Sequence, residues 1–361
     1  MKPISYNPVW MYFKGGFARC LLITTIYEIA KHVGVSPATV SRALSGKGYV
    51  RKELREKILQ VAKEMDYHPN TLARSLVTGQ SFIIGLVLPD ITNPFFPAIA
   101  RGVEDVAHRN GYNVILCNTD GSARKEADYL GLLRSKRVDG VIFTTSQVVT
   151  RHVRQLVDSD IPVVLADRRM NVDCDFVVVD SIEGAYKATS HLIGLGHSAI
   201  GLITGPQKVT TGAERIEGYS RALRDHHIVM RDELICEGDY KENSGYRHTK
   251  KLLGLSSRPT AIFACNDLMA MGALAALEEK GIRVPEEVAV VGYDDIPFAS
   301  VIRPRLTTVV QPKYEIGSIA CEILLERMKD RDKPRQEVFL KPNLMIRESS
   351  VILEVKEALS D

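Results

Sequence analysis

Apolar residues near the start of the chain recur at helical spacing in three short segments. The first begins at Thr25, which forms a capping box with Glu28, and it ends at Gly34, a residue suited to a turn. The second begins at Ser36, an N-cap residue followed by proline, and the third covers 52–65. The inward-facing positions of these helices are Ile29, Ala30 and Val33; Val40, Ala43 and Leu44; and Leu54, Ile58, Val61, Ala62 and Met65. Two short helices joined by a glycine turn and followed by a third helix predict a helix-turn-helix unit.

The outward face of the second predicted helix is polar. It carries Ser36, Thr39, Ser41 and Arg42, whose side chains can reach phosphates or base edges in DNA. The simpler interpretation is a small helical bundle without a ligand. The combination of a capping box, a glycine turn, a Ser-Pro helix start and a polar outer face favours DNA binding over that interpretation.

Charge is distributed unevenly along the chain. Residues 24–80 contain nine Lys and Arg against five Asp and Glu, and residues 1–23 contain three basic residues and no acidic one. The remaining residues, 81–361, carry 35 basic and 39 acidic groups. A small basic segment joined to a larger, mildly acidic one is typical of a DNA-binding head on a sensing body.

From residue 80 onward, nearly continuous apolar runs alternate with helical patterns such as 96–110. The predicted strands are 82–88, 113–117, 138–143, 162–166, 176–179, 199–203, 261–264 and 288–292. Apolar strands separated by helices indicate buried parallel sheets, and about ten strands are too many for one compact sheet. The sequence therefore predicts an all-α helix-turn-helix head followed by an α/β body of two doubly wound parallel-sheet subdomains.

Polar and aromatic side chains follow several of these strands. Because parallel sheets bind ligands at the carboxyl ends of their strands, these side chains are candidate effector-binding residues. They are Asn93, Phe95 and Phe96, Asp167 and Arg168, Asn266, and Asp294. Aromatic faces stack on sugars, and carboxylate, amide and guanidinium groups hydrogen-bond hydroxyls. Taken singly, Asp294 has an alternative role as a helix cap, Phe96 as a core residue, and Asp167 as an ion-pair partner of Arg168.

Composition and motif content exclude several classes of protein. With 361 residues, 45% hydrophobic and 25% charged, the chain is neither disordered nor a coiled coil. It contains no run of roughly eighteen uncharged apolar residues that could span a membrane. The six cysteines are scattered singly, which argues against a zinc motif or a disulfide framework and suits a reducing cytoplasm. No P-loop, dinucleotide-binding glycine motif, nucleophile elbow or zinc-protease motif occurs. We therefore expect a cytoplasmic protein that is not an enzyme and holds neither a metal nor a cofactor.

The stretch TIYEIAKHVGVSPATVSRALSGKGYV, residues 25–50, resembles the DNA-binding head of the LacI family of bacterial transcription regulators. The stretch YHPNTLARSL, residues 67–76, is similar to the hinge helix of that family, and the likeness runs on to about Arg347. The resemblance implies that Tyr49 belongs to the DNA-binding set and that Leu76 is an apolar wedge in the minor groove. It places further DNA contacts in the hinge at Asn70, Ala73 and Arg74. By itself the hinge is too short to be a stable helix in water, and its alternative interpretation is a plain linker.

We divide the chain into four parts on these grounds. They are an extension at 1–23, disordered or the product of a start codon placed too early; a helix-turn-helix domain at 24–68; a hinge helix and linker at 69–80; and an effector-binding and dimerisation domain at 81–361. The resemblance implies that this last domain is periplasmic-binding-protein-like. It also implies that the chain crosses between its two subdomains near residues 180, 311 and 341.

The resemblance adds Arg215, Tyr240 and Gln311 to the candidate effector-binding residues. The completed set is similar to that of ribose-binding relatives of the family. Purine-sensing members carry an arginine two residues before the threonine that corresponds to Thr211, and here that position is Val209. The difference argues against a nucleobase as the effector.

These observations predict a homodimeric repressor that binds a palindromic operator and is controlled by a small sugar such as ribose. A dimer is expected because residues 350–361 are too short for the leucine-heptad helix of tetrameric family members. We expect Arg215 and Asp294 to hold the sugar from opposite subdomains. The alternatives are control by a phosphocarrier protein partner, control by a nucleobase, and a sugar-binding transport receptor. A transport receptor would need an export signal and would not need a helix-turn-helix.

Overall fold

The computed structural model describes residues 25–45, 48–67, 79–144 and 150–352, and the chain divides into two compact units, 1–78 and 79–361. The proposed extension at 1–23 and four hinge candidates, Asn70, Ala73, Arg74 and Leu76, lie outside the described residues.

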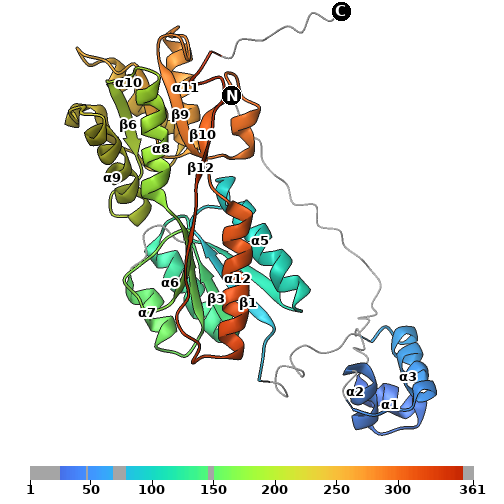
Figure 1. Cartoon of the computed structure of the whole chain (residues 1–361). Helices are drawn as coiled ribbons and strands as arrows, with labels where there is room; N and C mark the ends of the chain where they lie inside the picture. Colours follow the sequence, from blue (N-terminus) through green and yellow to red (C-terminus); the bar gives the residue numbers. More distant parts are fainter. Residues whose placement is uncertain (1–24, 46–47, 68–78, 145–149, 353–361) are drawn as a thin grey trace, which may run out of the picture. The chain divides into compact units, whose positions relative to one another are not determined.

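The first unit contains the three helices that the sequence predicts (Figure 1). They are α1 (Ile26–Val33), α2 (Pro37–Ser45) and α3 (Lys52–Glu64). The capping box is present, with the Thr25 N–H donating to Glu28 Oε2 at 2.7 Å and the Glu28 N–H donating to Thr25 Oγ1 at 3.4 Å. Gly34 closes α1 with a φ of 79°, which a side chain would make strained. Ile29, Val40 and Ile58 are fully buried where the helices meet, so this unit has its own apolar core.

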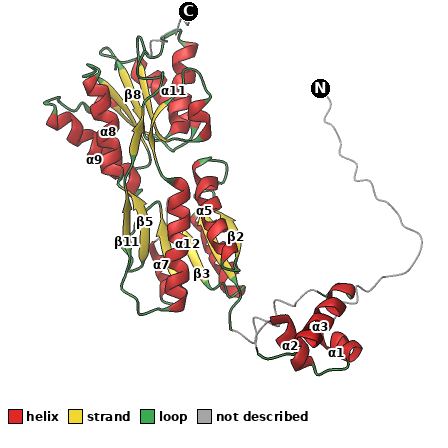
Figure 2. Cartoon of the chain, turned by 45° about the vertical axis from the view of Figure 1, so that its right-hand side comes forward, coloured by secondary structure: helices red, strands yellow, loops and turns green. Residues whose placement is uncertain are grey.

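The second unit contains two six-stranded sheets. The first has the order β11-β5-β4-β3-β1-β2, and all its neighbouring strands are parallel. Its strands are β1 (Ile83–Leu88), β2 (Asn113–Asn118), β3 (Gly140–Phe143), β4 (Val163–Ala166), β5 (Asp175–Val179) and β11 (Glu337–Leu340). One face packs on α5 (Phe95–Arg109) and α12 (Lys313–Lys329), and the other on α6 (Ala123–Ser135) and α7 (Thr150–Val157) (Figure 2).

The second sheet has the order β12-β10-β9-β8-β6-β7, and only β12 runs antiparallel to its neighbour. Its strands are β6 (Ile200–Thr204), β7 (Ile235–Glu237), β8 (Ala261–Ala264), β9 (Ala289–Asp294), β10 (Thr307–Val310) and β12 (Asn343–Met345). The helix pairs α8 (Ser181–Gly194) with α9 (Thr210–Asp225), and α10 (Glu242–Leu253) with α11 (Asp267–Glu279), cover it. Along β9, Gly292 faces α11 and Tyr293 faces α8, so the two pairs lie on opposite faces.

The chain passes between the sheets in three places: after β5, after β10 and after β11. In each sheet the first strand lies inside the order, between the second and third strands. The helical connections therefore leave in opposite directions from that strand, and ligands of doubly wound sheets bind at the carboxyl edge there. No helix in the described part of the chain is both long and apolar enough to cross a membrane.

Candidate functional site

The predicted DNA-contacting residues of the first unit lie on and just after α2. The Thr39 N–H donates to Ser36 Oγ at 3.2 Å, so Ser36 caps the helix. The side chains of Ser36, Ser41 and Arg42 are exposed, that of Thr39 is half-buried, and Tyr49 is 87% exposed although it is a large aromatic residue. Exposed basic residues at the start of α3 add positive charge to the unit: Arg51, Lys52 and Arg55.

A cavity of about 520 Å³ lies in the second unit, at the carboxyl ends of strands from both sheets. The ten predicted effector-binding residues all line it: Asn93, Phe95, Phe96, Asp167, Arg168, Arg215, Tyr240, Asn266, Asp294 and Gln311. Its rim adds further charged side chains, which are Asp90, Asp120, Asp239 and Lys241. The volume is that of a small-molecule site.

The first sheet contributes an aromatic corner to the cavity. Phe95 and Phe96 begin α5, and their rings meet edge to face with centroids 5.1 Å apart. Asn93 precedes them, and its Oδ1 accepts the Phe95 N–H at 3.1 Å. Both phenylalanines also belong to the apolar core, so they serve packing as well as the cavity wall.

Asp167 and Arg168 follow β4 and are buried beside each other. Asp167 has a φ of 69°, a left-handed conformation that non-glycine residues rarely adopt outside functional sites. Arg168 Nε lies 3.2 Å from Asp167 Oδ2, but Nε and Nη1 of Arg168 have no hydrogen-bond partner among the described residues. Burial raises the pKa of Asp167, against the opposing effect of Arg168 and Arg215. Arg168 therefore offers N–H donors that a ligand can satisfy.

Arg215 extends from α9 and is 3% exposed. One of its terminal nitrogens donates to the Cys265 carbonyl, and its Nε has no partner among the described residues. Tyr240, with a φ of 66°, closes the cavity nearby, and its Oη lies 3.2 Å from Thr211 Oγ1. The guanidinium carbon of Arg168 lies 5.8 Å from the centre of the Tyr240 ring.

Asp294 ends β9 with a φ of 114°, a strained conformation that several contacts hold in place. Gln311 Nε2 donates to Asp294 Oδ1 at 2.7 Å, and Lys313 Nζ donates to the carbonyls of Asp294 and Asp295. Burial raises the pKa of the Asp294 carboxyl to about 6, with Arg215 opposing that shift. Asp294 is therefore a buried acceptor whose charge changes near neutral pH.

Asn266 has less freedom to bind a ligand than its sequence position suggests. Its Oδ1 caps α11 by accepting the Met269 N–H at 2.9 Å, and its Nδ2 donates to the Tyr240 carbonyl at 2.9 Å. Both polar atoms of the side chain thus bind the protein itself. Asn266 shapes the cavity wall and joins the loop of Tyr240 to α11.

One expectation about the cavity is wrong. Arg215 and Asp294 do not face each other from opposite subdomains, because α9 and β9 both belong to the second sheet and its helices. The groups that oppose them come from the first sheet and α5: Asn93, Phe95, Phe96, Asp167 and Arg168.

Sequence reasoning also missed residues that fix the cavity from behind. Asp267 is fully buried, and its carboxylate accepts the Ile296 N–H at 2.8 Å and the Thr308 hydroxyl at 2.5 Å. Lys313 holds the two carbonyls named above. The adjacent pairs Asn266-Asp267 and Asp294-Asp295 were the only sequence signal for Asp267, and no signal marked Lys313.

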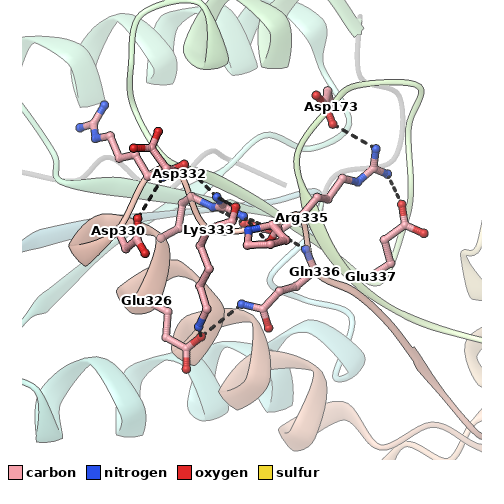
Figure 3. Close-up of polar contacts among 12 residues, drawn as sticks. Asp173, Glu326, Asp330, Asp332, Lys333, Arg335, Gln336 and Glu337 are labelled. Carbon is pink, nitrogen blue, oxygen red and sulfur yellow. Dashed lines mark hydrogen bonds and ion pairs between the residues drawn. The ribbon is translucent and has the colours of Figure 1, made fainter.

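A second cavity, of about 320 Å³, lies at the amino ends of β4 and β5. Its charged groups bind one another (Figure 3): Lys333 contacts Glu326, Arg335 binds Asp173 at 3.3 Å, and Arg335 also binds Glu337 at 2.9 Å. Because these donors are already paired, this cavity lacks the unpartnered buried groups that distinguish the first.

The described residues contain no group of three His, Cys, Asp or Glu side chains placed to hold a metal ion. Five described cysteines are unpaired: Cys117, Cys174, Cys236, Cys265 and Cys321. What the large cavity can do chemically is bind a small molecule rich in hydrogen-bonding groups. Two buried arginines supply donors, and the carboxylates of Asp167 and Asp294 supply acceptors.

Two family models match this chain. The model described as bacterial regulatory proteins, lacI family, matches residues 25–70, and the model described as periplasmic binding protein-like domain matches residues 189–350.

Similar full-length proteins are repressors. The ribose operon repressor of Halalkalibacterium halodurans is 40% identical over 91% of this chain and 97% of its own length. The transcriptional repressor PurR of Vibrio vulnificus is 37% identical over 91% and 98%. Catabolite control protein A of Priestia megaterium is 36% identical over 90% and 99%.

Solved structures show the same architecture. A LacI family transcriptional regulator from Enterococcus faecium with bound ribose is 34% identical, with a TM-score of 0.69 over 75% of this chain and 100% of that one. The lac repressor dimer bound to operator and an anti-inducer is 26% identical, with a TM-score of 0.83 over 91% and 99%.

Proposed function

The chain belongs to the lacI family of bacterial regulatory proteins, and from that premise we propose that it is a homodimeric repressor whose operator affinity is set by a small sugar, ribose being the first candidate. It is a DNA-binding transcription regulator rather than an enzyme. We further propose that residues 24–68 bind DNA, 69–80 form the hinge, and 81–361 bind the effector and dimerise. Because its target is operator DNA, it acts in the cytoplasm.

The observation that carries the sugar proposal is the donor and acceptor set of the large cavity. Arg168 and Arg215 present buried N–H groups that lack partners among the described residues. Hydroxyl groups both donate and accept, so one sugar can satisfy arginine donors and aspartate acceptors at once. The Phe95 and Phe96 corner supplies an apolar surface for the C–H face of the ring.

The relatives favour ribose without excluding the alternatives. One curated relative is a ribose operon repressor, and one similar structure holds ribose. The PurR relatives keep a nucleobase as an alternative, but the purine-sensing arginine expected from the resemblance is replaced by Val209, a buried N-cap residue of α9. Catabolite control protein A keeps control by a phosphocarrier protein as a second alternative.

We propose that Ser36, Thr39, Ser41, Arg42 and Tyr49 bind the operator together with the hinge residues. Lys and Arg contacts to phosphates release counterions, so operator affinity should fall steeply as salt concentration rises. A two-fold symmetric dimer binds a palindrome.

The test separates effector binding from DNA binding. A palindromic operator is first enriched from random DNA with the full-length protein, and its affinity is measured by fluorescence anisotropy with and without ribose. Arg215→Ala leaves buried hydroxyls of the sugar unpaired, at a cost of about 1–3 kcal/mol. This variant should lose the ribose response and keep operator affinity without ribose.

Arg221→Ala is the matched control, because Arg221 lies on the same helix, is exposed, and does not line the cavity. It should respond to ribose as the unchanged protein does. Calorimetric heat with hypoxanthine or a phosphocarrier protein, and none with ribose or other pentoses and hexoses, would overturn the sugar proposal.

A further inference from the structure

Arg215 rests on the face of an aromatic ring that does not line the cavity. The guanidinium carbon lies 3.7 Å from the centre of the Tyr293 ring, which is van der Waals stacking distance. Tyr293 is fully buried on β9, and it is not among the residues that line the cavity. Its contact with an effector is therefore indirect and passes through Arg215.

The ring holds the guanidinium where hydrogen bonds do little. One terminal nitrogen of Arg215 binds the Cys265 carbonyl, and Nε has no partner among the described residues. A cation over an aromatic face is attracted by the ring quadrupole, and the attraction grows when both groups are removed from water. Arg215 is 3% exposed and Tyr293 is 0% exposed, so both conditions hold.

The far side of the ring is kept in place by a glycine on α8. A Cβ added to Gly184 would lie 2.2 Å from Tyr293 Oη and 2.9 Å from Cζ. Any side chain at residue 184 would push the ring or the helix away. Gly184, Tyr293 and Arg215 thus form a continuous stack from α8 through β9 to the cavity.

From this stack we propose that Tyr293 is a positioning residue for effector binding: its ring face holds the Arg215 guanidinium toward the cavity, and Gly184 leaves room for the ring. The inference rests on the proposed function, in which Arg215 binds hydroxyl groups. It assigns Tyr293 a role in ligand affinity beyond filling the core.

The first test needs no effector. Nitrogen–proton NMR spectra of the full-length protein show arginine Nε–H signals, and the Arg215 signal is identified by its loss in Arg215→Met. Ring currents should displace this signal in the unchanged protein and in Tyr293→Phe, which keeps the ring. Tyr293→Leu should return it to the region of the other arginines. An Arg215 signal at the same position in the unchanged protein and Tyr293→Leu would overturn the positioning role.

The second test is a double-mutant cycle with ribose, followed by calorimetry. Tyr293→Phe should bind ribose as the unchanged protein does, and Tyr293→Leu should bind it roughly tenfold more weakly. In the Arg215→Met background, Tyr293→Leu should cause no further loss. Equal losses in both backgrounds would show that Tyr293 acts independently of Arg215 and would overturn the proposal.

Two further results keep these tests decisive. Gly184→Ala serves if Tyr293→Leu does not fold, because the added methyl should displace the ring, shift the Arg215 signal and weaken ribose. Neither effect in a folded Gly184→Ala protein would contradict the stack. If the unchanged protein binds no ribose, the proposed effector is wrong, while the NMR comparison still judges the positioning of Arg215 by itself.

Discussion

At the scale of single residues, the cavity is defined by charged groups held away from water with incomplete pairing. Arg168 and Arg215 keep N–H groups without partners, and Asp294 is held in a strained backbone conformation. Burying a charge without full pairing is costly, so such groups persist where a ligand completes them. The carboxyl of Asp294 is the one whose charge changes in an accessible pH range, because its pKa is raised to about 6.

This pKa predicts pH-dependent effector binding. Above pH 6 the Asp294 carboxyl is ionised and accepts sugar hydroxyls, whereas below pH 6 a proton must leave before the carboxylate can accept them. Ribose affinity should therefore be steady from pH 8 to 7 and fall as pH decreases through 6, by roughly tenfold per pH unit well below the pKa. Calorimetry at pH 7.5 and 5.5 measures this. Asp294→Asn should bind more weakly at pH 7.5 and lose the part of the pH dependence that comes from this group; equal affinity of the unchanged protein at both pH values contradicts the role of its charge.

The identity of the cavity residues was accessible from the sequence, but their partners were not. Asp167 and Asp294 follow predicted strands, and strand ends converge in a parallel sheet, so their proximity to a cavity could be foreseen. The periodicity of α9 does not tell which sheet that helix covers, which is why Arg215 was assigned a face opposite Asp294. Contacts such as Asp267 with Thr308 join residues 41 apart in the chain, and local pattern carries no information about them.

At the scale of elements, α5 and α12 approach so closely that their crossing requires glycine. A Cβ on Gly317 of α12 would lie 2.0 Å from the Ile99 carbonyl oxygen, and one on Gly102 of α5 would lie 2.2 Å from the Tyr314 carbonyl oxygen. These obstacles are backbone atoms, which cannot rotate away as a side chain can. The close crossing sets the position of α5, whose first residues form the aromatic corner of the cavity.

Gly317→Ala should therefore lower the free energy of unfolding of the second unit by at least about 1–3 kcal/mol. Gly131→Ala is the matched control, because Gly131 lies within α6 and a Cβ there would meet nothing within 4 Å. Alanine is the better helix former, so this variant should gain about 0.5–1 kcal/mol. Urea unfolding followed by circular dichroism measures both. A Gly317→Ala protein as stable as the unchanged one contradicts the tight crossing.

The eight predicted strands correspond to β1–β6, β8 and β9, and four others were not predicted individually. The missed strands are three or four residues long: β7, β10, β11 and β12. Three of them are edge strands, and β11 and β12 alternate between exposed and half-buried residues over a length too short to establish a period. The predicted strands are the buried inner ones, whose continuous apolar runs stand out from the helices around them.

An ion pair joins the loop after β4 to α9 and thus links the two subdomains. Arg169 Nη2 lies 2.8 Å from Glu214 Oε1, and Arg169 Nε donates to the same oxygen at 3.1 Å. Each residue is the chain neighbour of a cavity arginine, so the pair ties together the two segments that face the effector. Partly exposed pairs contribute about 0.2–1 kcal/mol, which predicts a modest effect on closure.

Reversing either charge, in Arg169→Glu or Glu214→Arg, should weaken ribose by roughly two- to fivefold, and the double reversal should restore the affinity. Calorimetry on the three variants measures the coupling between the two residues. Arg221→Glu tests a charge on α9 whose partner, Asp225, lies on the same helix, and it should leave ribose affinity unchanged. Additive losses in the double variant would show that the pair does not act across the subdomains.

At the scale of the whole molecule, function requires that a sugar in the second unit change DNA binding by the first. Each unit has its own apolar core, so neither needs the other to fold around its binding residues. Ligand control must then arise from a difference in sugar affinity between DNA-bound and free states. In regulated proteins that coupling is typically about 1–3 kcal/mol.

Such coupling is reciprocal, which gives a prediction about the complete protein. Operator DNA at saturation should change ribose affinity by the same factor by which ribose changes operator affinity, roughly 5- to 150-fold. Calorimetric titration of ribose into the protein–operator complex gives the first factor, and anisotropy with and without ribose gives the second. DNA of scrambled sequence, at a concentration that also saturates the protein, should leave ribose affinity nearly unchanged, because phosphate contacts alone do not fix the operator-bound conformation. Ribose affinity that is the same with operator, with scrambled DNA and without DNA would mean that the cavity and the DNA-binding head are not coupled, even if each binds its own ligand.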